Sequence, residues 1–273
     1  MNIGKRIIAV NSNCYHGYSI EDALEGIHAA GFHYVELTAT KGWTEHVFPT
    51  QSFAYLQGLK KKMGELDIKP FSMSGHCNLM DEERLPDFIQ NIELAHFFGC
   101  DYIVSSVGEA HLKDRQTTGN QVLCEHLRSL LPYLEKYQMT LVLEIHGDHC
   151  TGKILKEITD TVASKWVKIN YDTANAIFYG GVIPEEDMDN CGEDLEYIHL
   201  KDKAGEQKEW NFPALGEGYV NFPAIFKKLE EKQNLCPFSI EIEFTPEGAG
   251  SLENVNKAVK TSADYLIRHG FVL

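Results

Sequence analysis

The sequence predicts an α/β fold and, within that class, one (β/α)8 barrel that forms a single domain over residues 1–273. Short apolar runs alternate with longer amphipathic segments along the whole chain, as in repeated βαβ units. The chain has 273 residues, close to the roughly 250 that such a barrel needs. Eight of the apolar runs have the length and composition of strands, and eight parallel strands close a barrel of this kind.

The expected strands are rich in aliphatic and aromatic residues and lie at 6–11, 34–39, 70–76, 102–107, 140–146, 167–172, 197–201 and 238–244. Ser19 and Asp22 mark the start of a helix that ends at Gly31. Apolar residues with helical spacing predict further helices at 49–66, 81–98, 120–137, 152–164, 222–232 and 252–268, and a weaker one at 184–194. An open doubly wound sheet has the same alternation, so closure of the barrel must be judged from the polar residues.

The composition indicates a soluble cytoplasmic protein. The formal net charge of −15 repels the phosphates of DNA and RNA, so we expect no nucleic acid partner. Seven cysteines without a CxxC pair are typical of reduced thiols, so no structural disulfide is expected. The amino terminus lacks the apolar segment of a signal peptide, and no run approaches the roughly 18 apolar residues of a membrane span. We therefore expect no association with membranes.

Four of the expected strands carry polar side chains on one face. A parallel strand that is covered on both sides is normally almost continuously apolar. In LVLEIHG, however, Leu141 and Leu143 share one face and Glu144 lies on the other. The segments VKINYD, YIHLK and FSIEIEFT alternate in the same way, with the charged residues toward their carboxyl ends. This pattern indicates that the polar faces meet inside a closed barrel.

Three carboxylates in one barrel mouth would repel each other unless a cation joined them. Glu144, Asp172 and Glu241 occupy such positions, and His199 adds an imidazole. This hard, oxygen-rich set suits Mn²⁺, Co²⁺ or Mg²⁺ and tolerates Zn²⁺ or Fe²⁺. The sequence therefore predicts one divalent metal ion held by these four side chains. For His146, the residues fit a hydrogen-bonded histidine at a strand end as well as a substrate contact.

The strand-end motifs resemble those of the xylose isomerase-like TIM barrel family, which includes sugar isomerases, epimerases, inosose dehydratases and type IV apurinic endonucleases. LEIHG, NYDTAN, YIHLKD and FSIEIE resemble the family's motifs on strands five to eight, and LGEGYVNFPAIFKKL resembles its GxG loop and seventh helix. The resemblance implies the same four metal ligands. Its third-strand SGH motif places His76 at the substrate. VEL resembles the family's second-strand end, where Glu36 either contacts the substrate or forms a salt bridge.

By this resemblance the protein is expected to be a divalent-metal-dependent sugar isomerase or epimerase that acts on a ketose, a polyol-derived ketone or a related small carbohydrate. A divalent ion polarises the carbonyl and stabilises the enediolate that forms when an α-proton leaves. Glu144 and Glu241 would be the acid/base pair, while His76, His146, Asn175 and Lys201 would orient the substrate. The resemblance also implies a homodimer or homotetramer.

Other functions remain open at this point. If a β-hydroxyl leaves before reprotonation, the same chemistry becomes dehydration of the inosose or dehydroshikimate type. Asn175 stands where sugar epimerases of the family often carry histidine, and asparagine cannot shuttle a proton near neutral pH. A barrel that binds a sugar without turnover is a further alternative. An apurinic endonuclease is the least expected, because its multi-zinc site needs additional histidines and the chain is acidic.

Overall fold

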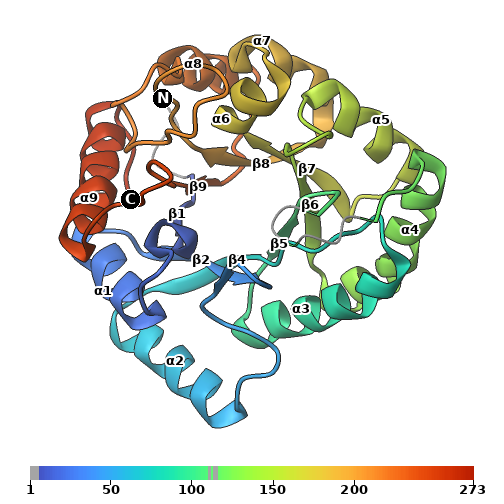
Figure 1. Ribbon diagram of the computed structural model, residues 1–273, viewed down its shortest axis with the longest axis horizontal. Helices are drawn as coiled ribbons and strands as arrows, with labels where there is room; N and C mark the ends of the chain where they lie inside the picture. Colours follow the sequence, from blue (N-terminus) through green and yellow to red (C-terminus); the bar gives the residue numbers. More distant parts are fainter. Residues whose placement is uncertain (1–5, 110–111, 113–115) are drawn as a thin grey trace.

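The computed structural model describes residues 6–109, 112 and 116–273, and its parallel strands form a closed barrel (Figure 1). Each parallel strand pairs with the next, and β1 pairs with both β2 and β9, which closes the ring. An open sheet is therefore excluded, and the predicted (β/α)8 barrel is confirmed. The eight barrel strands are β1 (Ile8–Asn11), β2 (Tyr34–Thr40), β4 (Lys69–Ser74), β5 (Tyr102–Ser105), β6 (Thr140–Glu144), β7 (Val167–Asp172), β8 (Leu195–Leu200) and β9 (Phe238–Ile240).

Helices surround the barrel on its outer side (Figure 1). They are α1 (Ile20–Ala30), α2 (Phe53–Glu65), α3 (Leu85–Phe98), α4 (Asn120–Tyr137), α5 (Gly152–Val162), α7 (Pro184–Asp187), α8 (Phe222–Glu231) and α9 (Leu252–Arg268). As expected, Ser19 and Asp22 cap the start of α1 reciprocally, and Gly31 ends it with a φ of 98°. Among the described residues, every helix is too short or too polar to cross a membrane.

Several elements differ from the expectation. The segment expected to form a helix at 184–194 forms the short α7 and a 3-10 segment, η5 (Met188–Asp194), which Gly192 interrupts. A short strand, β3 (Thr44–Glu45), pairs antiparallel with β2. After β7, α6 (Thr173–Asn175) continues into a π-helical turn, η4 (Ala176–Gly180). Two further 3-10 turns, η2 (Ser12–Tyr15) and η3 (Glu82–Arg84), follow β1 and precede α3.

The last barrel strand is shorter than the expected 238–244. It ends at Ile240: the Glu241 N–H still bonds to β8, but the backbone from Ile242 onward bonds to residues outside the neighbouring strands. Glu241 donates its N–H to Leu200 O, Ile242 donates to the Cys14 thiol, and Phe244 forms an isolated bridge with Phe212. All seven cysteines lie in the described part of the chain and are free thiols.

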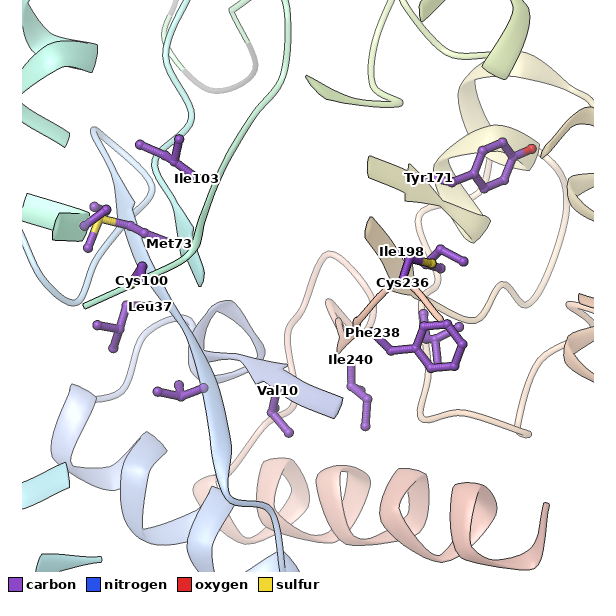
Figure 2. Close-up of a cluster of buried hydrophobic side chains, with 14 of the residues drawn as sticks. Val10, Leu37, Met73, Cys100, Ile103, Tyr171, Ile198, Cys236, Phe238 and Ile240 are labelled. Carbon is purple, nitrogen blue, oxygen red and sulfur yellow. The ribbon is translucent and has the colours of Figure 1, made fainter. Parts of the chain in front are cut away.

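Alternation along the strands separates two apolar layers. Outward side chains such as Leu37, Ile198 and Ile240 lie on the helix side of the strands (Figure 2). A smaller cluster of Phe71, Val104, Val142 and Tyr197 fills the inside of the barrel. Because Val142 lies inward, Glu144 two residues later also points inward, nearer the carboxyl end of its strand. The barrel core thus has an apolar floor with a polar layer above it.

Candidate metal site

Four side chains meet at the carboxyl end of the barrel. Glu144 and Asp172 are the last residues of β6 and β7, His199 lies in β8, and Glu241 follows β9. Each of the four is at least 95% buried, and one potential ligand atom from each lies within 4.8 Å of the others. His199 Nδ1 is 3.3 Å from Glu144 Oε1, 3.4 Å from Glu241 Oε2 and 3.8 Å from Asp172 Oδ2. This cluster can hold a metal ion.

The environment of Asp172 supports a cation at this point. Its Oδ1 accepts the N–H groups of Ala174 (2.9 Å) and Asn175 (2.7 Å), whereas the buried Oδ2 has no hydrogen-bond partner. Burial raises the pKa of this carboxyl well above its usual value, and although Lys201 opposes the rise, the charges of Glu144 and Glu241 add to it. An unpartnered buried carboxylate oxygen is unfavourable, and a divalent ion would neutralise it together with its neighbours. The donor set therefore fits a hard divalent metal.

Glu36 lies behind His199 rather than beside the pocket. The carboxylate is fully buried and its Oε1 is 3.1 Å from His199 Nε2. It also accepts hydrogen bonds from Tyr197 Oη (2.8 Å), Asn11 Nδ2 (3.1 Å) and Ser72 Oγ (3.3 Å). Burial lowers the pKa of His199, but Glu36 and then Glu241 and Glu144 outweigh burial and raise the pKa well above its usual value. Such a histidine–carboxylate pair orients a metal-binding imidazole.

Two neighbours fix the orientation of Glu144. His76 Nδ1 accepts the N–H of Ser106 at 2.9 Å, so its Nε2 carries the proton, and this nitrogen lies 3.1 Å from Glu144 Oε2 as an ion-pair partner. Asn175 Nδ2 donates to Glu144 Oε1 (3.2 Å) and to Ile145 O (3.1 Å). Burial opposes ionisation of Glu144, but His76 and His199 together hold its pKa well below the usual value. Glu144 is therefore an ionised, well-positioned carboxylate.

Lys201 and Asn13 hold Glu241 on the opposite side. Lys201 Nζ pairs closely with Glu243 and lies 3.5 Å from Glu241 Oε2. Asn13 Nδ2 donates to both acids, at 3.2 Å to Glu241 Oε1 and 3.3 Å to Glu243 Oε1. Despite burial, Lys201 and then His199 lower the pKa of Glu241. The expected ligand Glu241 thus has a fixed cationic neighbour.

The remaining wall comes from His146 and Tyr179, whose Nε2 and Oη lie 3.3 Å apart. Burial lowers the pKa of His146 to about 4, although Glu144 opposes this shift, so the imidazole is neutral at physiological pH. A pocket of about 30 Å³ opens above the cluster. Of the residues expected at the substrate, His76, His146, Asn175 and Lys201 line this pocket, whereas Glu36 does not.

Sequence reasoning missed Asn13 and Tyr179. Asn13 had a detectable signal, because Asn11 and Asn13 are polar residues of the same parity at the end of an apolar strand. Tyr179 had none, because a π-helical turn positions it and the local sequence AIFYG has no pattern that distinguishes it from an ordinary helix. Single π-helical turns are rare overall, and those that occur are often found at functional sites.

Comparisons with known proteins agree with this architecture. The model of the family described as xylose isomerase-like TIM barrel matches residues 24–269. Inosose dehydratase of Geobacillus kaustophilus (strain HTA426) is 25% identical, in a match that covers 69% of this chain and 70% of that enzyme. The structure of an L-ribulose 3-epimerase has a TM-score of 0.73 at 17% identity, covering 97% of this chain and 94% of that one. The structure of the IOLI protein with a zinc atom has a TM-score of 0.73 at 19% identity and covers 96% of both chains.

Proposed function

Because this chain belongs to the xylose isomerase-like TIM barrel family, we propose that it is a divalent-metal-dependent sugar isomerase or epimerase. Its substrate would be a ketose, a polyol-derived ketone or a related small carbohydrate. The observation that carries the proposal is the meeting of Glu144 and Glu241 in one buried group of side chains that could hold a cation, with both also lining the pocket. An L-ribulose 3-epimerase has the same fold, which agrees with this reading.

The metal would be held by the clustered atoms of Glu144, Asp172, His199 and Glu241. When bound, it would polarise the substrate carbonyl and so ease loss of the α-proton. Mn²⁺, Co²⁺ and Mg²⁺ fit three carboxylates and one imidazole best, and Zn²⁺ or Fe²⁺ also fits. The zinc atom in the IOLI structure supports including zinc among the metals tested.

Glu144 and Glu241 would exchange the substrate proton. The pKa of each carboxyl lies below its usual value despite burial, because His76 and His199 act on Glu144 and Lys201 and His199 act on Glu241. One carboxylate would take the α-proton, and a group on the opposite side of the substrate would return a proton to the resulting enediolate. On the Glu144 side, His76 Nε2 lies 3.1 Å from Glu144 Oε2, so its proton could be passed to that carboxylate.

The other pocket residues would orient the substrate. His146 is neutral, so its imidazole can donate or accept a hydrogen bond to a hydroxyl. Asn175 offers an amide, and the Lys201 ammonium lies beside Glu241, where it can neutralise developing negative charge. Asn175 and Lys201 are buried, which would help to keep water away from the reacting carbons.

The test is proton exchange at substrate carbon. Metal-stripped protein is reloaded with Mn²⁺ or Co²⁺ and incubated in D₂O with ketoses, inososes and hydroxypyruvate, and deuterium incorporation is followed by NMR. Glu241→Gln should lower the exchange rate by at least about 100-fold, because it removes a proton-transfer group. Glu247→Gln, an exposed acid on the same loop, is the matched control and should retain exchange. If Glu241→Gln binds metal fully and its exchange rate stays within a few-fold of that of wild type, Glu241 has no catalytic role.

Dehydration is the second candidate. Inosose dehydratase is the 25% identical relative, and Asn175 in place of a proton-shuttling histidine leaves the fate of the enediolate open. In the same D₂O experiment an isomerase and a dehydratase both exchange the proton, but only a dehydratase accumulates an unsaturated product that has lost water. A barrel that only binds sugar would show neither signal.

A further inference from the structure

A chamber of about 550 Å³ opens beside the mouth of the barrel. Its walls come from the loops after β1, β2, β8 and β9. It shares four lining residues with the small pocket above the candidate metal ligands, namely Asn13, Trp43, Trp210 and Glu243. The two spaces are therefore neighbours with common walls, and Asn13 contacts Glu241 directly.

The volumes indicate how a substrate would extend. The pocket above the cluster measures only about 30 Å³, so it accommodates little more than the reacting carbons. The chamber, at about 550 Å³, has the size of an ordinary small-molecule pocket, for which about 300–1,000 Å³ is typical. A molecule that reacts at Glu144 and Glu241 would therefore place its remaining atoms in the chamber.

The chamber has rigid aromatic walls. Trp43 stacks on His16 with ring centroids 4.1 Å apart, and its Nε1 donates to Asn13 Oδ1 at 3.0 Å. Trp210 packs edge to face against Phe212, with centroids 5.0 Å apart. Aromatic surfaces that are already fixed can stack on a ligand ring with little loss of conformational entropy.

The backbone of Phe244, another wall residue, is held in an unusual conformation. Its φ of 58° is rare for a bulky residue and raises the energy of the chain. Two hydrogen bonds with Phe212, of 2.8 and 2.9 Å, hold it there. They tie the loop after β9 to the loop after β8, so the chamber wall is preformed.

The charge of the chamber favours a neutral occupant. Among the described residues that line it, none is a lysine or arginine, and the one acid, Glu243, already pairs with Lys201. Burial lowers the pKa of His16, so that imidazole is neutral at physiological pH. Apolar groups such as Ile242, Pro246 and Val255 make up much of the remaining surface. A phosphate group would find no cationic partner here.

We propose that the substrate is a carbohydrate joined to an uncharged, apolar ring, such as an aryl group, which lies in this chamber between Trp43 and Trp210. The inference rests on the proposed function for the carbohydrate half of the molecule. The proposed substrate therefore differs from free monosaccharides and from sugar phosphates. The aryl group supplies binding energy through the aromatic walls, while the carbohydrate presents its carbonyl and hydroxyl groups to the pocket above the cluster.

The test compares equilibrium binding of matched glycosides to the full-length, Mn²⁺-loaded protein. The probes are the 4-nitrophenyl and methyl glycosides of glucose, galactose and xylose, together with glucose 6-phosphate. The glycosides are acetals without a free carbonyl, so they present hydroxyl groups only and report binding rather than turnover. Binding is followed by calorimetry and by saturation transfer to the nitrophenyl protons. For at least one sugar, the aryl glycoside should bind about tenfold more tightly than the methyl glycoside, which corresponds to about 1.4 kcal/mol. Equal affinities, no detectable binding of any aryl glycoside, or tightest binding of the phosphate would overturn the proposal.

Two variants test whether the aryl group binds in the chamber. Ala249→Trp fills the chamber, and Trp43→Leu removes one aromatic wall, so either should reduce the aryl-to-methyl ratio to near one. Ile183→Trp, at an exposed position of 53% relative accessibility away from the chamber, is the matched control and should keep the wild-type ratio. Circular dichroism identifies a variant that fails to fold. In that case the aryl-to-methyl ratio of the other variant is the test. An unchanged ratio in a folded variant would also overturn the proposal.

Deuterium exchange separates this inference from the proposed function. Exchange with a free ketose, but no preference for aryl glycosides, would overturn the inference and leave the proposed function standing. Aryl preference without exchange of any ketone would overturn the proposed function and retain the chamber as a binding site.

Discussion

Glu36 and His199 are both fully buried and lie 3.1 Å apart, below the three carboxylates of the candidate metal site. Since Nε2 of the imidazole faces Glu36, its Nδ1 faces Glu144, Asp172 and Glu241 at 3.3, 3.8 and 3.4 Å. Tyr197, Asn11 and Ser72 in turn hold the Glu36 carboxylate. We infer that Glu36 is a positioning residue, which acts on the metal through His199.

Glu36→Gln should therefore weaken metal binding by roughly 10–100-fold, because an amide holds and polarises the imidazole less well than a carboxylate. The measurement is competition with a chelator of known affinity for Mn²⁺ or Co²⁺, with circular dichroism as the check on folding. Glu25→Gln, an exposed acid paired with Lys62, is the matched control. Metal affinity within threefold of wild type in Glu36→Gln would contradict the positioning role.

His46 makes stability depend on pH. Its side chain is buried, Nε2 bonds to Tyr18 O at 3.1 Å, and burial lowers its pKa to about 4. With a usual pKa near 6.5, the unfolded chain binds the proton first, so the free energy of unfolding should fall as the pH drops from 6.5 toward 4. The full effect is roughly 3 kcal/mol, at about 1.4 kcal/mol per pKa unit.

Urea unfolding between pH 7 and pH 4 measures this effect. His46→Gln retains a donor for Tyr18 O but does not titrate, so its stability should fall less steeply with acidification than that of wild type. His28→Gln, at an exposed position of α1, is the control and should follow the wild-type curve. Parallel curves for wild type and His46→Gln would show that His46 does not contribute.

The inward side chains could be predicted because alternation along a strand fixes the face. Glu144 and His199 point inward as their spacing from apolar neighbours requires. The depth of each inward side chain along the barrel axis could not be predicted from the sequence. Glu36 also points inward, but it lies one layer below the pocket, and β2 and β4 shift register between Val35 and Glu36. Such shifts depend on packing between strands that are distant in sequence.

At the scale of elements, Asp202 organises the loop that follows β8. Its buried carboxylate accepts the N–H groups of Lys203 (2.8 Å), Gly216 (2.8 Å), Gly218 (2.9 Å) and Val220 (3.1 Å). A Cβ at Gly218 would collide with Lys203 O and Asp202 Oδ1, which explains the glycine in the GEG segment. The loop therefore wraps around one carboxylate.

Asp202→Ala should reduce the free energy of unfolding by about 2–4 kcal/mol, because it leaves four N–H groups without their charged acceptor. Urea denaturation measures the loss, and Asp202→Asn, which keeps one acceptor oxygen, should lose less. Asp264→Ala is the matched control: its partner Lys260 lies on the surface of α9, so the change should stay within about 1 kcal/mol. A similar loss in both alanine variants would contradict the organising role.

The longer helices could be predicted because apolar periodicity and capping residues are local signals. The boundaries of α4 and α9 match the predicted ranges. The short β3 and the π-helical turn η4 could not be predicted, since tertiary contacts stabilise them. The interaction of Tyr179 with His146 and the pairing of β3 with β2 are examples of such contacts. These elements shape the rim of the site, where the sequence is least informative.

At the scale of the whole molecule, strand number and inward polarity together predicted the closed barrel. Eight strands alone fit an open sheet as well, but three carboxylates and one imidazole at the inner ends of four strands need a common interior. The charge of that interior is the main consequence of closure. Glu144, Asp172 and Glu241 lie around one point, and His199 Nδ1 lies within 3.8 Å of a carboxylate oxygen of each.

Metal binding should therefore stabilise the entire barrel. An ion that binds only the folded chain adds about 2.7 kcal/mol at a free concentration 100 times its Kd. For a chain of this size, each kcal/mol raises Tm by about 2–4 °C, so we expect an increase of about 5–10 °C. Differential scanning calorimetry with Mn²⁺ and with a chelator measures the shift.

Matched variants assign this shift to the cluster. Asp172→Asn removes the oxygen that has no hydrogen-bond partner, so it should abolish most of the difference between the metal-loaded and chelated protein. Asp189→Asn disrupts the surface pairs with Lys228 and Lys232, so it can lower both Tm values but should leave their difference unchanged. Equal Tm values for wild type with metal and with chelator would mean that the four side chains hold no ion, and the proposed sugar chemistry would then lose its basis.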